Sequence, residues 1–256
     1  MRESLRHCTE QLRIYASLLL LGLICLTWTV VALPLRWLLP ARLGQRCGRR
    51  GIFVGLRFYA WTLHAMGIFR LDLQVLKSLR NGPPVVIAPN HPSLIDALLI
   101  LAHVPNVACV MKSALEHNLF LGAGAQLARY IGNEPTRRMI AGAVAQLQDG
   151  NSVLLFPEGT RTVHAPINPL TASVAIIARR GNAPVQTLLI EQDKPLLGKG
   201  WSVWWWQSLP VVYRMRLGRR FEPQPDARAL TEELQRYFHE QLASSAQNRW
   251  VGSRRT

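Results

Sequence analysis

A stretch of 22 uncharged, mostly apolar residues, from Ile14 to Leu35, most constrains what this chain of 256 residues can fold into. As an α-helix the stretch would extend about 33 Å, enough to cross a hydrocarbon core of about 30 Å. A cleaved signal peptide has a shorter apolar run that ends at a small-residue cleavage site, and no clear site of that kind follows here. We therefore predict a membrane-embedded helix rather than a signal peptide.

The charges that flank this run bear on how it enters the membrane. Three arginines precede it and five follow it. Because cytoplasmic flanks carry the excess of Lys and Arg, the heavier C-terminal flank would place the rest of the chain at the cytoplasmic face of the inner membrane. Charge on both sides also fits a helix that enters one leaflet and returns, with the segment 51–61 as the returning or interfacial helix. We favour the hairpin, with a full span as the alternative.

The composition narrows the class of partner. Lys and Arg together number 30 against 15 Asp and Glu, so the formal net charge is +15. Such a charge predicts a nucleic acid, an anionic lipid or a phosphorylated substrate as partner. The apolar stretch and the eight tryptophans favour lipid, and no helix-turn-helix, RNA-binding or zinc-finger signature supports a nucleic acid. The four cysteines show neither CxxC pairing nor metal-ligand spacing, so we expect no bound metal.

From Val85 onward, short apolar segments alternate with helical patterns, which is typical of an α/β fold. We predict strands at 85–88, 107–111, 153–156, 185–189 and 211–217, and helices at 92–103, 135–149, 170–180 and 226–243. The expected architecture is a mixed sheet flanked by helices and preceded by a membrane-embedded helical hairpin. Residues 1–70 would form the hairpin motif, 71–245 the α/β domain and 246–256 a basic, frayed tail.

The segment 194–210 stands apart, because four tryptophans lie beside two lysines in it. Indole rings with a hydrated N–H are typical of the membrane–water interface. A loop packed over the sheet edge is the alternative. We favour contact with the interface.

The segment Asn90-His91-Pro92-Ser93-Leu94-Ile95-Asp96 is the most informative for chemistry, because it joins a predicted strand to a predicted helix. With Pro92 as the first helical residue, the imidazole of His91 can fold back toward Asp96 in the second helical turn. The carboxylate would hold one ring N–H and leave the other nitrogen to accept a proton from a substrate hydroxyl. A capping histidine beside a solvated aspartate is the structural alternative.

A second block, Phe156-Pro157-Glu158-Gly159-Thr160-Arg161, follows another apolar segment about 65 residues later. In this order and spacing, the two blocks resemble those of the 1-acyl-sn-glycerol-3-phosphate acyltransferase (PlsC-like) family of glycerolipid acyltransferases, from about Val85 to Val185. The resemblance implies an acyltransferase with an N-terminal two-helix membrane motif. It implies a thioester of acyl carrier protein or coenzyme A as co-substrate, a lysolipid acceptor from the membrane, and no cofactor beyond these.

Catalytic roles follow for the first block. His91 would be the general base and Asp96 its orienter, with the substrate hydroxyl in the place that a serine takes in a triad. We expect direct attack without an acyl-enzyme, since the chain has no GxSxG elbow, and Ser93 as nucleophile is the less favoured alternative. Backbone N–H groups at the start of the predicted helix are candidates for stabilising the oxyanion.

Acceptor binding is expected at the second block and at Lys112. Arg161 can bind a phosphate through two N–H groups, and Gly159 lets the backbone turn sharply or approach a ligand closely. Glu158 would orient Arg161 or an acceptor hydroxyl, with a structural ion pair to Arg161 as the alternative. The resemblance adds Lys112 as a further phosphate contact, against a solvated surface lysine.

The chain departs from the family at Tyr130-Ile131-Gly132-Asn133. Members that act on lysophosphatidic acid usually carry aromatic-Ile-Asp-Arg there, so Gly132 stands for the Asp and Asn133 for the Arg. A phosphate-binding charge is lost unless Arg129, Arg137 or Arg138 replaces it. We predict lysophosphatidic acid or another lysolipid as the acceptor. The departure weakens the case for lysophosphatidic acid, and the alternative is a specialised acceptor, such as lyso-ornithine lipid or a specialised lipid built on an acyl carrier protein. A lipid hydrolase and a non-catalytic lipid-binding protein are the other rivals.

Overall fold

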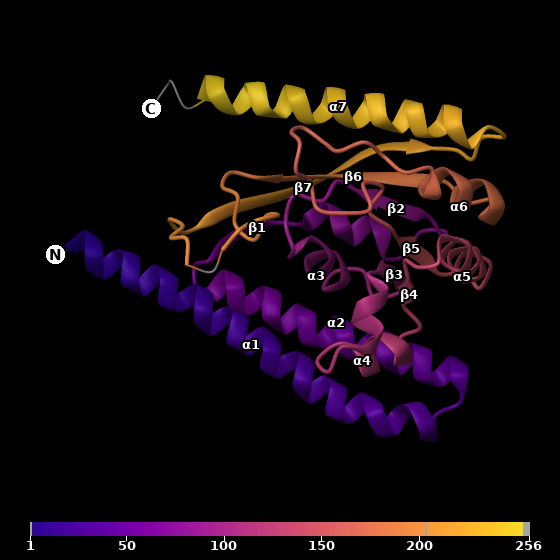
Figure 1. Ribbon diagram of the computed structural model, residues 1–256, viewed down its shortest axis with the longest axis horizontal. Coiled ribbons are helices and arrows are strands. Elements are labelled where there is room, and N and C mark those ends of the chain that lie inside the picture. Colours follow the sequence, from indigo (N-terminus) through magenta and orange to yellow (C-terminus); the bar gives the residue numbers. More distant parts are fainter. Residues whose placement is uncertain (1, 203, 253–256) are drawn as a thin grey trace.

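A computed structural model describes residues 2–202 and 204–252 of the chain. Two long antiparallel helices come first, α1 (Arg2–Leu38) and α2 (Ala41–Ala65), and lie along one side of an α/β body (Figure 1). By length and composition the segment Ser4–Leu38 is a candidate membrane span, and only 11% of its most apolar window is buried by the rest of the described chain. The predicted helical hairpin is therefore present. Its second helix begins ten residues earlier than the predicted start at 51, because the arginine-rich segment that follows Pro40 is also helical.

A seven-stranded sheet in the order β1-β7-β6-β2-β5-β3-β4 forms the centre of the body. Neighbouring strands are parallel except β6 and β7, which are antiparallel, so the predicted mixed sheet is confirmed. The strands are β1 (Phe69–Asp72), β2 (Val86–Pro89), β3 (Val107–Met111), β4 (Ile131–Gly132), β5 (Ser152–Leu154), β6 (Val185–Gln192) and β7 (Val211–Phe221). The edge strands β1 and β4 were not predicted, because segments of four and two residues carry too little alternation.

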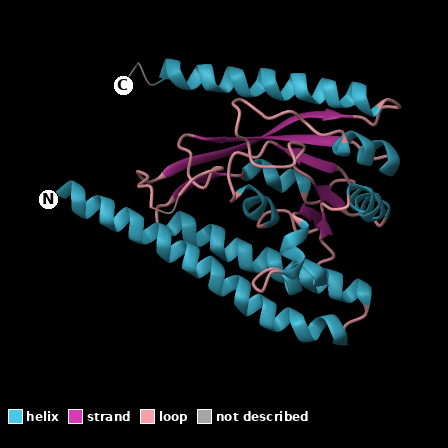
Figure 2. Ribbon diagram, in the orientation of Figure 1, coloured by secondary structure: helices cyan, strands magenta, loops and turns pink. Residues whose placement is uncertain are grey.

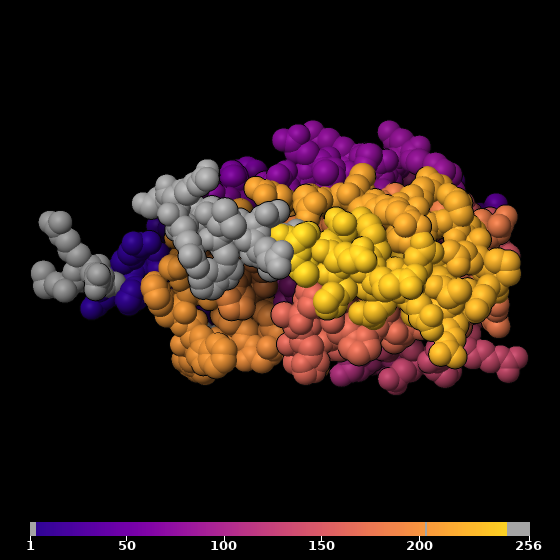
Figure 3. All heavy atoms as spheres, turned by 90° about the horizontal axis from the view of Figure 1, so that it is seen from above, coloured from indigo at the N-terminus to yellow at the C-terminus, as the bar shows by residue number. Residues whose placement is uncertain are grey.

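Helices cover both faces of the sheet (Figure 2). The shorter helical elements are η1 (Gln74–Leu79), α3 (Asp96–Leu101), η2 (Ser113–His117), α4 (Gly122–Leu127), α5 (Thr136–Gln148) and α6 (Ser173–Gly181), and the last described element is α7 (Ala227–Gly252). Successive residues of the central strands point to opposite faces. Ile87 belongs to the core that packs against α2 and α3, whereas Val86 and Ala88 belong to the core beneath α5, α6 and α7. Seen from above, α7 lies across the top of the body (Figure 3).

Three predicted helix boundaries were wrong. The helix predicted from 92 begins at Asp96, because the Ser93 N–H bonds to the Asp96 carboxylate and the Leu94 N–H to the Leu197 carbonyl instead of opening a helix. The helix predicted from 170 begins at Ser173, because the Leu170 N–H donates to the Gln235 side chain. The predicted frayed tail is helical as far as Gly252, and residues 253–256 lie outside the described residues.

Gly48 allows α2 to approach α4 closely, and we expect Gly48→Ala to destabilise the protein. A Cβ at this position would lie 2.5 Å from the backbone nitrogen of Ala128, so the two elements would have to separate. Overpacking of this kind costs about 1–3 kcal/mol, more than the roughly 1 kcal/mol that alanine gains over glycine in a helix. Thermal unfolding in detergent measures the effect. Gly22→Ala, whose Cβ would meet nothing within 4 Å, is the control, and equal midpoints for the two variants would contradict the prediction.

Candidate active site

The two predicted site blocks and Lys112 come together at one edge of the sheet. β2, β5 and β3 are parallel neighbours, and they lead at their carboxyl ends into His91, Glu158 and Lys112 respectively. Open α/β sheets bind ligands at this edge, where loops from adjacent strands meet. The arrangement makes the carboxyl edge of β2 and β5 the candidate active site.

The predicted contact between His91 and Asp96 is present. Nδ1 of His91 lies 2.8 Å from Oδ2 of Asp96. The imidazole stacks on the ring of Phe156, with ring centroids 3.8 Å apart and planes inclined at 22°. The His91 side chain is 16% exposed, whereas Asp96 is completely buried. Within the described residues no hydrogen bond occupies Nε2, so this nitrogen is the one that a substrate hydroxyl can reach.

Asp96 is held by two further donors. Its Oδ2 accepts the backbone N–H of Ser93 at 2.8 Å, and its Oδ1 accepts a short hydrogen bond from the hydroxyl of Tyr213 on β7. Burial raises the pKa of the Asp96 carboxyl, and the hydrogen bonds from His91, Tyr213 and Ser93 oppose that rise. Burial, together with the charge of Asp96, holds the pKa of Tyr213 well above its ordinary value, so this hydroxyl remains a donor. The carboxylate that accepts hydrogen bonds from Ser93 and Tyr213 also accepts one from the Nδ1–H group of His91. Nε2 is then the unprotonated ring nitrogen that can act as a base.

Tyr213 was not predicted to be a site residue, although the strand that carries it was predicted. Residues on β7 alternate between buried and exposed, and Tyr213 is on the buried side. A buried tyrosine needs a partner for its hydroxyl, and this requirement was the available signal. Its partner lies 117 residues away in the sequence, so the contact itself was not predictable.

We expect Tyr213→Phe to move the acidic limb of the pH–rate profile to higher pH. The Tyr213 hydrogen bond lowers the pKa of Asp96, so its loss raises that pKa and lets the His91–Asp96 pair take up protons at higher pH. One hydrogen bond to a charged group corresponds to a displacement of about one pH unit. Steady-state rates across pH measure it, with Tyr59→Phe, a buried tyrosine on α2, as the control. An unmoved limb would show that Tyr213 does not act on the pair.

Glu158 was predicted to orient Arg161 or an acceptor hydroxyl. In the structure its carboxylate instead fixes the backbone of His91. Its Oε1 accepts the His91 N–H at 2.8 Å and the Thr162 hydroxyl at 2.7 Å, and its Oε2 accepts the Asn168 N–H at 2.9 Å. The Thr162 N–H in turn donates to the His91 carbonyl at 2.7 Å. Glu158 of the second block and the adjoining Thr162 therefore fix both the N–H and the carbonyl group of His91. The alternative, an ion pair with Arg161, is not found among the described residues.

Arg161 turns toward the loop 194–210. Its Nη1 donates to the carbonyls of Leu197 and Gly198, at 3.1 and 2.9 Å. Gly159 has a φ of 68°, a conformation that favours glycine, so the predicted sharp turn is present. Lys199 of the same loop reaches Thr160, with 3.4 Å between Nζ and the hydroxyl oxygen. Two cations, Arg161 and Lys199, thus lie beside the second block, and the sequence analysis had singled out only the first.

Lys112 is exposed at the end of β3, and the neighbouring Asn133 has a structural role. The side-chain oxygen of Asn133 accepts the Ser113 N–H at 3.0 Å, which ties the loop after Lys112 to the loop after β4. A Cβ at Gly132 would lie 2.2 Å from the Glu116 carboxylate. The altered segment therefore supports the loop that carries Lys112 and supplies no charge of its own.

The predicted oxyanion donors at the start of the helix are already used. The Ser93 N–H bonds to Asp96, and the Leu94 N–H donates to the Leu197 carbonyl at 3.0 Å. The Ser93 hydroxyl is also buried and donates to the Leu196 carbonyl at 2.9 Å. Both findings count against a role of these groups in the chemical step.

Comparison with known proteins adds the family. Residues 70–191 match the family model described as Acyltransferase. Residues 70–191 therefore carry an acyltransferase domain. The crystal structure of the 1-acyl-sn-glycerophosphate (LPA) acyltransferase PlsC from Thermotoga maritima is similar, with a TM-score of 0.65 and 18% sequence identity over 96% of this chain and 98% of that chain. The two proteins share a fold along nearly their whole lengths, helical hairpin included.

An apolar cavity of about 170 Å³ lies between the hairpin and the body of this acyltransferase. α1 contributes Trp28, α2 contributes Ile52, β3 contributes Met111, and α3 contributes Ala97 and Leu98. Ala97 directly follows Asp96 in the chain, so α3 contributes both to the cavity lining and to the catalytic candidate pair. The sequence did not reveal these lining residues, because they converge from separate segments of the chain.

The tryptophans of the loop 194–210 divide between interior and surface. Trp201 packs against the core, whereas Trp204 and Trp205 are 81% and 62% exposed. Trp206 donates its indole N–H to Glu10 at 3.0 Å and lies against the ring of His7, which brings the loop to the start of α1. Exposed indoles beside a candidate membrane helix suit the predicted interfacial contact, which stays a prediction.

Proposed function

We propose that this acyltransferase is a membrane-associated O-acyltransferase that transfers a fatty acyl group from acyl carrier protein or coenzyme A to a lysolipid hydroxyl. The observation that carries the proposal is the His91–Asp96 pair, in which Nδ1 is fixed by a buried carboxylate and Nε2 has no hydrogen bond among the described residues. This is the geometry of a positioned general base. A lipid-binding protein without activity has no need of it.

The reaction then needs no acyl-enzyme. Nε2 of His91 takes the acceptor's hydroxyl proton while the oxygen forms its bond to the thioester carbonyl. The carbon–sulfur bond breaks, and the imidazolium returns the proton to the departing thiolate. Asp96 stabilises the imidazolium through Nδ1, as the acid does in a triad. The engaged hydroxyl of Ser93 supports this direct route.

The apolar cavity is the proposed place of the acyl chain. Its lining is contributed by the hairpin as well as the body, so a chain that leaves the bilayer along α1 and α2 can enter without crossing water. We propose that the hairpin holds the enzyme at the cytoplasmic face of the inner membrane. The net charge of +15 would steer an acidic carrier protein or an anionic lipid toward it, and no nucleic acid, metal or further cofactor is proposed.

Two acceptor classes remain, and different observations favour each. Arg161 and Lys199 beside the second block, with Lys112 on the same edge, favour a phosphate such as that of lysophosphatidic acid, the acceptor for which the similar PlsC enzyme is named. The loss of charge at Gly132 and Asn133 favours a specialised acceptor, such as lyso-ornithine lipid. We propose lysophosphatidic acid or a related lysolipid first, because the cations at the second block are in place.

Acyl transfer by detergent-purified protein tests the proposal. Labelled acyl carrier protein and labelled acyl coenzyme A serve as donors, with a panel of lysolipids as acceptors. Acylated lysophosphatidic acid would support the first acceptor class, and acylation of another lysolipid alone would support the second. Free fatty acid released equally well without any acceptor would identify a hydrolase and overturn the proposal.

A further inference from the structure

A second, polar cavity of about 390 Å³ lies at the opposite edge of the sheet from His91. Asn106 directly precedes β3 and Asn151 directly precedes β5, so the cavity faces the amino ends of strands whose carboxyl ends form the active site. Its floor is the first turns of α2. The volume is within the range of small-molecule sites, roughly 300–1,000 Å³. No step of the proposed reaction uses this cavity.

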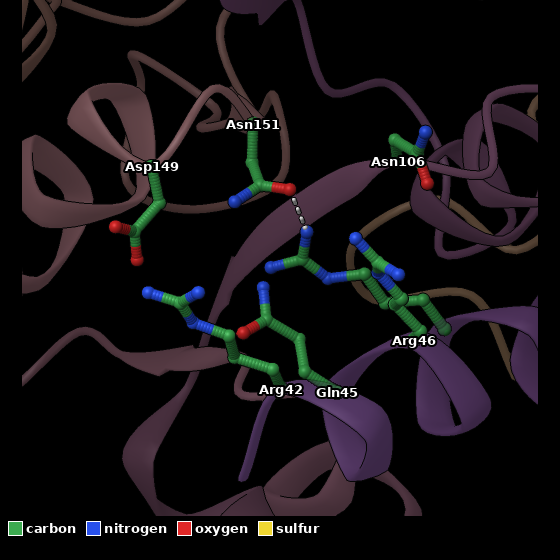
Figure 4. Close-up of a pocket in the computed structure, with 7 residues that line it drawn as sticks. Arg42, Gln45, Arg46, Asn106, Asp149 and Asn151 are labelled. Atoms are coloured by element: carbon green, nitrogen blue, oxygen red, sulfur yellow. Dashed lines mark hydrogen bonds between the residues drawn. The ribbon is translucent and has the colours of Figure 1, made fainter.

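Three arginines of α2 line it: Arg42, Arg46 and Arg49. Figure 4 shows the side chains of Arg42 and Arg46 directed into the space below the loops that carry Asp149, Asn151 and Asn106. The lining includes one carboxylate, that of Asp149. Within the part of the chain that the structure describes, none of the three guanidinium groups forms an ion pair. The cavity therefore carries an excess of positive charge.

Arg49 is the most informative of the three, because it is only 4% exposed. Its partners are neutral oxygens: Asn151 at 2.7 Å, Gln146 at 2.6 Å and the Ala128 carbonyl at 3.2 Å. Burial lowers the pKa of its guanidinium to about 10, so the group is still charged at neutral pH. Asp149 in the lining attracts this charge, but among the described residues no carboxylate is bonded to it, so an anion in the cavity would supply the direct partner that a buried charge needs.

The N-terminus of α2 adds to the positive electrostatic potential of the cavity. The helix begins at Ala41 beside the cavity, and its first turn contains no acidic residue and no side-chain cap. The free N–H groups of the first turn carry a partial positive charge that attracts anions. Arginine binds phosphate oxygens with two parallel N–H groups, and Arg42 and Arg46 project from successive turns of one helix face.

We propose that this cavity is a phosphate-binding site, and that its occupant is the phosphate of an anionic lipid headgroup. The segment around Arg42 favours a lipid over free phosphate, because Trp37, Leu38 and Leu43, within five residues of Arg42 in the sequence, are 86%, 74% and 51% exposed. Apolar residues next to a cationic cavity suit a headgroup whose acyl chains lie in the bilayer. The site would anchor the tip of the hairpin at the membrane surface, and it does not depend on acyl transfer.

Thermal unfolding in a neutral detergent tests the site, with water-soluble dihexanoyl-phosphatidylglycerol as the lipid probe and inorganic phosphate as the free anion. The variant Arg42→Gln/Arg46→Gln removes two exposed cavity charges, so it should fold. We expect the lipid to stabilise the wild type and its apparent affinity to fall about tenfold or more in this variant. The matched control is Arg36→Gln/Arg50→Gln, which removes two exposed charges near the same end of the hairpin but outside the cavity lining.

Each outcome decides the question. A lipid effect that only the cavity variant loses supports a headgroup site. An equally variant-dependent effect of inorganic phosphate supports the phosphate site with a free anion as its ligand. No stabilisation by either probe, or equal losses in both double variants, would overturn the site and leave only general charge attraction. Should the double variant unfold, Arg42→Gln alone is expected to weaken binding about fivefold, and unchanged affinity would again overturn the proposal.

Discussion

His91→Ala is expected to lower the turnover number for acyl transfer by about 10²- to 10⁴-fold, the usual contribution of a positioned general base. The imidazole is the group in this site that can take the acceptor's proton, because its Nδ1 is bound to Asp96 and Nε2 is not. The loss should appear in the turnover number with every acceptor of the panel. Single-turnover acylation with labelled donor measures it without interference from product release.

Two controls separate chemistry from folding in this experiment. The thermal midpoint of His91→Ala should stay near that of the wild type, since the His91 backbone contacts to Glu158 and Thr162 do not need the imidazole. His239→Ala, on the exposed side of α7, should retain wild-type activity. Activity of His91→Ala within a few-fold of wild type would rule out the proposed base.

The sequence allowed the fold class to be predicted because the body repeats short apolar strands and longer helices. The length of α2 was underestimated because its apolar face is interrupted by arginines. The buried residues Gly44 and Gly48 precede Leu56, Tyr59 and Leu63 at helical spacing, and this pattern was the available signal for the earlier start. The predicted start of α3 was wrong because a local hydrogen bond from Ser93 to Asp96 and a tertiary one from Leu94 to the loop 194–210 compete with helix formation.

The two halves of the site were not equally predictable. His91 and Asp96 are five residues apart, so a local turn suffices to join them. The hydrogen bond from Tyr213 to Asp96 and that from His91 to Glu158 span 117 and 67 residues. Such contacts depend on the order of strands in the sheet, which the alternation of strands and helices does not specify. The structure places the second block beside His91, and Glu158 bonds to the His91 N–H in place of the predicted contact with Arg161.

The contacts of Glu158 predict that this residue positions His91 and does not bind the acceptor. Its carboxylate is 5% exposed and accepts three hydrogen bonds, one of them from the His91 N–H. Glu158→Ala would leave these donors without acceptors in a buried place, at about 1–3 kcal/mol for each that stays unpaired. We therefore expect a loss of stability of a few kcal/mol and a displaced His91.

Glu158→Gln separates the effect on catalysis from the loss of stability. The amide oxygen can still accept the His91 N–H, but its NH₂ group opposes the Asn168 N–H that the carboxylate now accepts. We expect the turnover number to fall about tenfold to 100-fold, since a base displaced by about 1 Å loses that much, with the acceptor KM within about threefold of wild type. Steady-state kinetics with varied acceptor measure both constants, and Glu222→Gln, at an exposed position, is the matched control. A raised acceptor KM with an unchanged turnover number would instead place Glu158 in acceptor binding, because loss of an interaction made equally with bound substrate and transition state changes KM alone.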